Sequence, residues 1–185
     1  MGRGGTNFQE SLRARYARFA RAQGGAAAVE FALMAVPFFL LLFGIMELAL
    51  IFLLSTTLDN AAGEVARRIR TGEMQTQGGA SASSFKTAIC DNLGWIKGDC
   101  ATHLYVDVRT FDSFQQAGAA QSLLQNEAFD PLTFQFNLGQ QNSIVLVRAY
   151  YKWPFITPLV GKAMGQFKDG STVVMTAVTF RNEPY

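Results

Sequence analysis

The sequence predicts an α+β protein in which a long N-terminal transmembrane helix continues into a small extracytoplasmic domain. Residues 31–54 form an apolar run that only Glu47 interrupts. Three later segments, residues 102–111, 143–153 and 171–184, have the alternation or the β-branched residues of strands. Because long connections join these segments, we expect a three-stranded antiparallel sheet with short helices on one face.

Residues 1–25 form a basic leader with one acidic residue, Glu10. Its five basic residues are Arg3, Arg13, Arg15, Arg18 and Arg21. Arginines that flank a span mark its cytoplasmic side. We therefore expect the N-terminus in the cytoplasm and the chain beyond about residue 55 outside.

Residues 26–54 are expected to cross the bilayer. Their apolar run exceeds the roughly 7–15 residues of a secretory signal and supplies the roughly 20 residues that a spanning helix needs. Pro37 lies inside the span and predicts a kink or local loosening. A tolerated membrane proline is the favoured interpretation, ahead of a functional hinge.

Residues 55–73 are expected to extend this helix beyond the membrane. Apolar side chains recur there at helical spacing, at Leu58, Ala61, Ala62, Val65, Ala66 and Ile69. Glu64 precedes Arg67 and Arg68 by three and four positions, which favours pairing on a solvated helix surface. Gly72 is a helix stop signal.

Residues 74–185 are expected to form one periplasmic α+β domain. Residues 83–95 have the spacing of a short amphipathic helix, and a second helix is predicted around residues 117–126. Residues 154–165 are expected to form an apolar connector that Pro158 and Gly161 break. About 130 residues outside the bilayer are enough for one modest core.

Cys90 and Cys100 are the only cysteines and would lie in an oxidising compartment. A disulfide between them is favoured over two free thiols. His103 is the single histidine, so no metal cluster is expected. We also expect no enzyme, because the chain has no nucleophile elbow, phosphate loop or dinucleotide fingerprint.

The net charge of +2 is the sum of two parts of the chain that differ in charge. The leader holds 5 of the 16 basic residues and 1 of the 14 acidic ones. Residues 26–185 therefore carry 11 basic and 13 acidic residues, a net charge of −2. No basic face is left for nucleic acid, so a nucleic-acid partner is rejected.

Two carboxylates in the apolar region are costly and need an explanation. Near the helix start, Glu30 would be tolerated by the helix dipole and interfacial water in a plain signal anchor. Glu47 would lie well inside a span of residues 26–54. It marks either a subunit contact or the outer boundary of the membrane, and the polar residues from Ser55 onward favour the boundary.

One combination of features in residues 24–72 is more specific than its parts. It comprises Gly25, an Ala-Val-Glu-Phe sequence that ends at Phe31, and Pro37. It also includes the pair Gly44 and Glu47 and an Asn-Ala-Ala…Ala-Arg segment at residues 60–67. This stretch resembles the TadE-like family, pseudopilin-like proteins of the bacterial tight-adherence (Tad, type IVc) pilus system. The resemblance covers roughly a quarter of the chain.

The resemblance implies that a prepilin peptidase cuts the precursor after Gly25. Ala26 would then become the N-terminus and Glu30 the fifth residue, which would pair with the amine of a neighbouring subunit. Cleavage after Gly24 would make the glutamate the sixth residue, so Gly25 is favoured. Helix packing would involve Phe31, Pro37, Gly44 and Glu47.

The combined expectation is a minor pseudopilin in the inner membrane of a Gram-negative bacterium, acting by helix packing and without a cofactor. Its partners would be the prepilin peptidase, TadF- or TadG-like subunits, the major pilin and the lipid bilayer. The alternative is an uncleaved, signal-anchored periplasmic protein that binds a ligand or belongs to the assembly platform.

Overall fold

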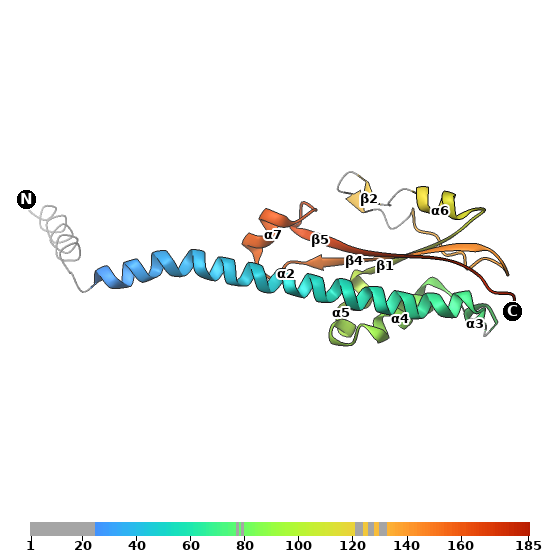
Figure 1. The fold of residues 1–185 in the computed structure, drawn as a ribbon. Coiled ribbons are helices and arrows are strands. Elements are labelled where there is room, and N and C mark those ends of the chain that lie inside the picture. The colour runs from blue at the N-terminus through green and yellow to red at the C-terminus, as the bar shows by residue number, and fades with distance from the viewer. Residues whose placement is uncertain (1–24, 77, 79, 121–123, 126–127, 130–132) are drawn as a thin grey trace, which may run out of the picture. The chain divides into compact units, whose positions relative to one another are not determined.

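The computed structural model describes residues 25–76, 78, 80–120, 124–125, 128–129 and 133–185. The chain divides into two compact units, Met1–Phe43 and Gly44–Tyr185. The second unit holds the folded α+β domain, which confirms the predicted fold class (Figure 1).

Helix α2 covers Ala26–Arg70 and has Pro37 inside it. Among the described residues it is the one helix that is long and apolar enough to cross a membrane. In the first unit its apolar side chains, including Phe31, are exposed. A lipid environment would cover such a surface, because a helix that is apolar on all sides needs apolar surroundings.

Within the second unit, one face of α2 is fully buried. Its buried apolar residues are Leu54, Leu58, Ala61, Ala62, Val65, Ala66 and Ile69. The set contains every residue that the helical spacing predicted. The helix ends where expected, because Gly72 adopts φ +77° and its amide donates to the carbonyl of Ile69 at 3.0 Å. The short helix α3 (Glu73–Thr76) follows.

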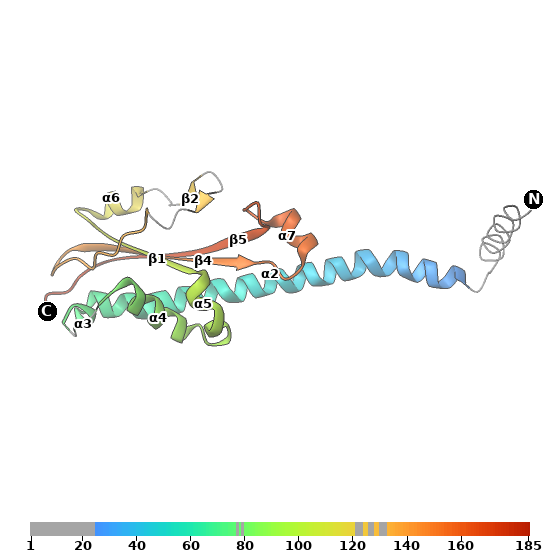
Figure 2. The ribbon, with the colours of Figure 1, turned by 180° about the vertical axis from the view of Figure 1, so that it is seen from behind.

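The sheet consists of β1 (Leu104–Phe111), β4 (Ile144–Pro154) and β5 (Ser171–Arg181) in the order β1-β4-β5, antiparallel throughout. This confirms the predicted three-stranded sheet. One face packs on α2 and presents alternate residues of β1 and β4, such as Val106 and Ala149. The strands run along the helix, as Figures 1 and 2 show.

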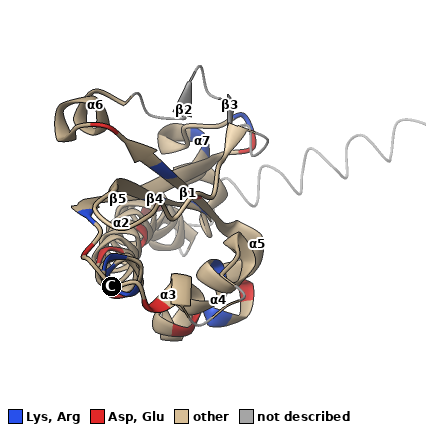
Figure 3. Cartoon of the chain, turned by 90° about the vertical axis from the view of Figure 1, so that its right-hand side faces the viewer, with Lys and Arg blue, Asp and Glu red and all other residues tan. Residues whose placement is uncertain are grey.

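Three short helices complete the layer that contains α2. They are α4 (Ala82–Asn92), the 3-10 helix η2 (Gly94–Ile96) and α5 (Lys97–His103). Figure 3 shows α2 beside α3, α4 and α5 under the same face of the sheet. Ser81 caps α4 through a reciprocal hydrogen-bond pair with Ser84, which satisfies backbone donors at the helix start.

A disulfide links Cys90 in α4 to Cys100 in α5, as predicted. The segment between them is largely helical rather than a turn-rich loop, because α4 reaches Asn92 and α5 begins at Lys97. His103 is the last residue of α5, so its predicted place in the strand is corrected. Its ring stacks on Tyr151 with 5.9 Å between ring centroids.

On the other face of the sheet lie α6 (Phe114–Ala119) and two short strands, β2 (Leu124–Gln125) and β3 (Ala128–Phe129). The helix predicted around residues 117–126 thus starts earlier and ends at Ala119, and part of that range lies outside the described residues. Ser113 caps α6 by accepting a hydrogen bond from the Gln116 amide, which explains the earlier start.

The predicted broken connector at residues 154–165 is in fact ordered around a helix, α7 (Pro158–Met164). Pro158 does not break the helix because it occupies the first turn, where the missing N–H has no intrahelical partner to lose. Gly161, the other predicted breaker, lies inside α7 and is buried there together with Val160.

The disulfide should make a measurable contribution to stability. We expect the double substitution of Cys90 and Cys100 by serine to lower the free energy of unfolding by about 3 kcal/mol, because a cross-link of this length restricts the unfolded chain. Urea unfolding of the full chain in detergent micelles, followed by near-UV circular dichroism, measures the change. The same loss should appear in the wild-type chain under reductant, and an unchanged urea midpoint in both would contradict the prediction.

Candidate functional site

The carboxylate of Glu47 is buried inside the protein and fully engaged. The residue is only 2% exposed. Its Oε1 accepts hydrogen bonds from Trp153 Nε1 at 3.1 Å and from the Ile156 amide at 3.0 Å. Its Oε2 accepts a third from the Thr157 amide at 3.1 Å. An acidic residue in the apolar run therefore binds a segment more than a hundred residues further along the chain.

The local sequence explains why these three donors converge. Trp153 lies on the face of β4 that packs on α2, so its indole N–H points into an apolar layer and needs an acceptor. The strand ends at Pro154, and the chain turns before α7 begins at Pro158. The amides of Ile156 and Thr157 thus belong to neither a strand ladder nor a helix interior, and Glu47 satisfies them.

Burial without partners would make Glu47 strongly destabilising, since the effective penalty for an ion in a protein interior is several kcal/mol. Three hydrogen bonds to a charged acceptor offset this cost. Breaking the arrangement would also leave the indole and two amides unpaired. The cluster of Glu47, Trp153, Ile156 and Thr157, called the Glu47 clamp below, therefore fixes the end of β4 and the start of α7 to α2.

Gly44 lies one helical turn before Glu47 and faces Val160 of α7. A Cβ at Gly44 would meet Val160 Cγ2 at 3.9 Å, an ordinary van der Waals distance. Val160 therefore lies over the glycine at a distance that would also accommodate an alanine. The sequence pair Gly44 and Glu47 thus corresponds to two contacts that hold the same segment, one apolar and one polar.

The other predicted site residues lie in the first unit. Gly25 directly precedes α2, Ala26 is the first residue of the helix, and Glu30 lies in the first two turns. All three are exposed, as are Phe31 and Pro37. Among the described residues, no hydrogen bond or ion pair engages the Glu30 carboxylate.

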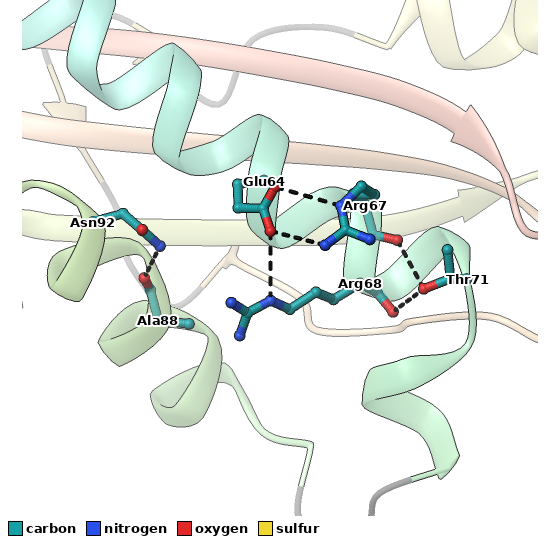
Figure 4. Close-up of polar contacts among 6 residues, drawn as sticks. All are labelled: Glu64, Arg67, Arg68, Thr71, Ala88 and Asn92. Carbon is teal, nitrogen blue, oxygen red and sulfur yellow. Dashed lines mark hydrogen bonds and ion pairs between the residues drawn. The ribbon is translucent and has the colours of Figure 1, made fainter.

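The arginines near the end of α2 form a solvated surface, as predicted (Figure 4). Glu64 Oε1 lies 2.9 Å from Arg67 Nη2 and 4.0 Å from Arg68 Nε. The hydrogen bond from Arg67 lowers the pKa of Glu64 below its ordinary value. Because these side chains are exposed, water screens the pairs and they contribute little to stability.

An open aromatic cleft lies beside the Glu47 clamp. Trp95, Tyr151, Trp153 and Ile156 contribute to its wall, and its volume is about 330 Å³. The rings of Trp95 and Trp153 are 6.1 Å apart between centroids. Burial, with a smaller contribution from the charge of Asp99, raises the pKa of Tyr151. Tyr151 and Trp153 are core residues.

Nothing in the described part of the chain resembles a metal centre, since no group of three His, Cys, Asp or Glu side chains converges there. Sequence reasoning missed the Glu47 clamp. The available signals were a single carboxylate in an apolar helix and an indole at the end of a strand. Local patterns cannot pair these two signals, because the pairing depends on how the sheet lies along α2.

These observations define a class: a protein with one apolar helix suited to a single-pass membrane anchor and a soluble C-terminal α+β domain built around the end of that helix. The family model described as "TadE-like protein" matches residues 25–67, which confirms the TadE-like resemblance of this segment. The match covers 43 of the 185 residues. No curated protein and no solved structure matches the chain.

The Glu47 clamp predicts a local effect of substitution. In Glu47→Gln, an amide group replaces one acceptor oxygen and leaves a buried donor unpaired, which costs about 1–2 kcal/mol. Hydrogen exchange at the amides of Ile156 and Thr157 should accelerate roughly 5–30-fold in the full chain in micelles. Glu64→Gln, a change at an exposed glutamate of the same helix, is the matched control and should leave both amides unchanged. Equal protection in the Glu47 variant and the wild type would refute the clamp.

Proposed function

We propose that this protein is a minor pseudopilin of a Tad (type IVc) pilus, acting by helix packing in pilus biogenesis or adherence. The observation that carries the proposal is the extent of the family match. It begins at Gly25 and includes Glu30, so it begins at the residue after which a prepilin peptidase would cut.

In this proposal the precursor lies in the inner membrane, with residues 1–25 in the cytoplasm and the α+β domain in the periplasm. The five leader arginines support that orientation through the positive-inside rule. Residues 26–54 supply the apolar helix that the bilayer holds before assembly. The oxidising periplasm would also form the disulfide between Cys90 and Cys100.

Cleavage between Gly25 and Ala26 would create an α-amine at the start of α2. In the low dielectric of a bundle of apolar helices, an amine and a carboxylate attract strongly, and either one alone is costly to bury. Glu30 has the position for this role because it becomes the fifth residue. Its carboxylate is exposed and, among the described residues, has no partner in the isolated chain.

The exposed apolar surface of the first unit supports packing against other helices. Phe31 and Pro37 belong to this surface, and it would pass from lipid to neighbouring pilin-like helices during assembly. The partners in the proposal are the prepilin peptidase, TadF- or TadG-like subunits and the major pilin. When the helix leaves the membrane for the pilus, the α+β domain would move with it, because the domain packs on the buried half of α2.

Processing is the first test of the proposal. We expect a mature N-terminus at Ala26 in cells with the prepilin peptidase and an intact leader in cells without it, because the peptide bond after Gly25 is the proposed cleavage site. Intact mass and N-terminal sequencing of the membrane protein measure both. Gly25→Leu should block the cut, whereas Gly63→Ala, at a helical glycine with open space around it, should not. A leader retained in both strains would favour an uncleaved anchor that belongs to the assembly platform.

The second test addresses Glu30. We expect Glu30→Ala to abolish piliation while membrane insertion stays intact, since removal of one partner of a buried ion pair costs about 3–5 kcal/mol. Filament yield and membrane fractionation in a strain that carries the variant measure the two effects. Glu64→Ala removes an exposed glutamate from the same helix and serves as the control. Normal piliation with Glu30→Ala would argue against amine pairing.

A further inference from the structure

We propose that the end of the α+β domain that carries α7 rests on the outer surface of the bilayer and forms a second membrane contact beside the helix. The contact consists of Trp95, Ile156, Leu159, Lys162 and Lys168, called the seating surface below. It requires only that α2 anchors the protein in a membrane, so it holds whether or not the protein is a pilus subunit.

The apolar part of the seating surface is exposed, although one side of the Trp95 ring lies near Trp153. Ile156 is 69% exposed, Leu159 61% and Trp95 46%. Trp95 and Ile156 line the same cleft, and Leu159 lies in the first turn of α7. Exposed large aliphatic side chains next to a tryptophan are typical of a surface that meets the boundary between lipid and water.

The polar part of the seating surface fits lipid headgroups. Lys162 and Lys168 are exposed and line one hollow of about 550 Å³ together with Pro158. Among the described residues, neither lysine has an ion pair. The nearby Asp169 is instead bound by Lys152 at 2.6 Å and by Ser171, which hold its pKa well below the ordinary value. The two lysines therefore remain available for phosphate groups.

The position of the seating surface along α2 indicates that the bilayer, rather than another protein, covers it. The Glu47 clamp ties Ile156 and Thr157 to α2 inside the apolar segment that the sequence assigns to the membrane. At the opposite end of the sheet, Glu183 lies 3.0 Å from Arg70. Within the second unit the domain thus extends along α2 from Glu47 to Arg70, and α7 lies at the Glu47 end.

The dimensions agree with this placement. Residues 26–47 comprise 22 helical residues, or about 33 Å, which matches a hydrocarbon core of about 30 Å. Exposed apolar side chains continue on α2 to Leu53, about 9 Å further along the helix, which corresponds to the headgroup layer. Glu47 then lies at the outer edge of the hydrocarbon core, where hydrogen-bond donors of the protein take the place of water. The seating surface lies at the same depth in the bilayer.

A depth measurement on the full chain tests the proposal. Both native cysteines are in the disulfide, so a single added cysteine carries a nitroxide label without interference. The two variants are Leu159→Cys on the seating surface and Met175→Cys on β5, a matched apolar residue that is 44% exposed. Each is placed in nanodiscs of phosphatidylethanolamine and phosphatidylglycerol, and relaxation by oxygen is compared with relaxation by a water-soluble nickel complex.

We expect oxygen to dominate relaxation at position 159 and the nickel complex to dominate at position 175, with a severalfold difference between their ratios. Lys162→Gln together with Lys168→Gln should reduce the oxygen preference at position 159. Replacement of phosphatidylglycerol by phosphatidylcholine should do the same. A label at position 159 as open to nickel as the one at 175 would overturn the proposal. Shielding from both reagents that disappears on dilution would also overturn it, because a second copy of the chain would then cover the surface.

Discussion

Burial of one face of α2 is the constraint on which the rest of the domain depends. From Leu54 to Ile69 the helix presents small and aliphatic side chains at helical spacing, and the sheet covers them on one side. About 35 Å of helix separates Glu47 from Arg70, and the 11 residues of β4 reach about the same length. Strands of that length can therefore follow the helix from end to end, which allows one helix to organise the whole sheet.

The ends of this arrangement are fixed by polar contacts, whereas its middle is held by apolar packing. At one end the buried carboxylate of Glu47 accepts three hydrogen bonds, and at the other end the Glu183 amide donates to the carbonyl of Arg70 at 2.8 Å. Apolar packing alone tolerates sliding of a sheet along a helix with repeated small residues. Directional contacts at both ends set the register, because a shifted sheet would leave buried donors unpaired.

Local patterns predicted much of this fold and little of the site. The buried face of α2, the helix stop at Gly72 and the three strands follow from periodicity and turn chemistry, which are local properties. The helix α7 was missed because Pro158 was interpreted as a breaker, although a proline in the first turn is compatible with a helix. The Glu47 clamp joins residues more than a hundred positions apart, so no window of sequence contains both partners.

Glu30 and Glu47, the two carboxylates in the apolar part of α2, differ in how their hydrogen-bonding needs are met. Glu47 is satisfied within its own chain, because both of its carboxylate oxygens already accept hydrogen bonds from local donors. Glu30 is exposed, and the described residues offer it no donor. A carboxylate that enters an apolar environment must find a donor or an opposite charge there. If the chain assembles with other helices, the requirement for a partner therefore falls on Glu30, while Glu47 keeps the domain fixed to the helix that is being assembled.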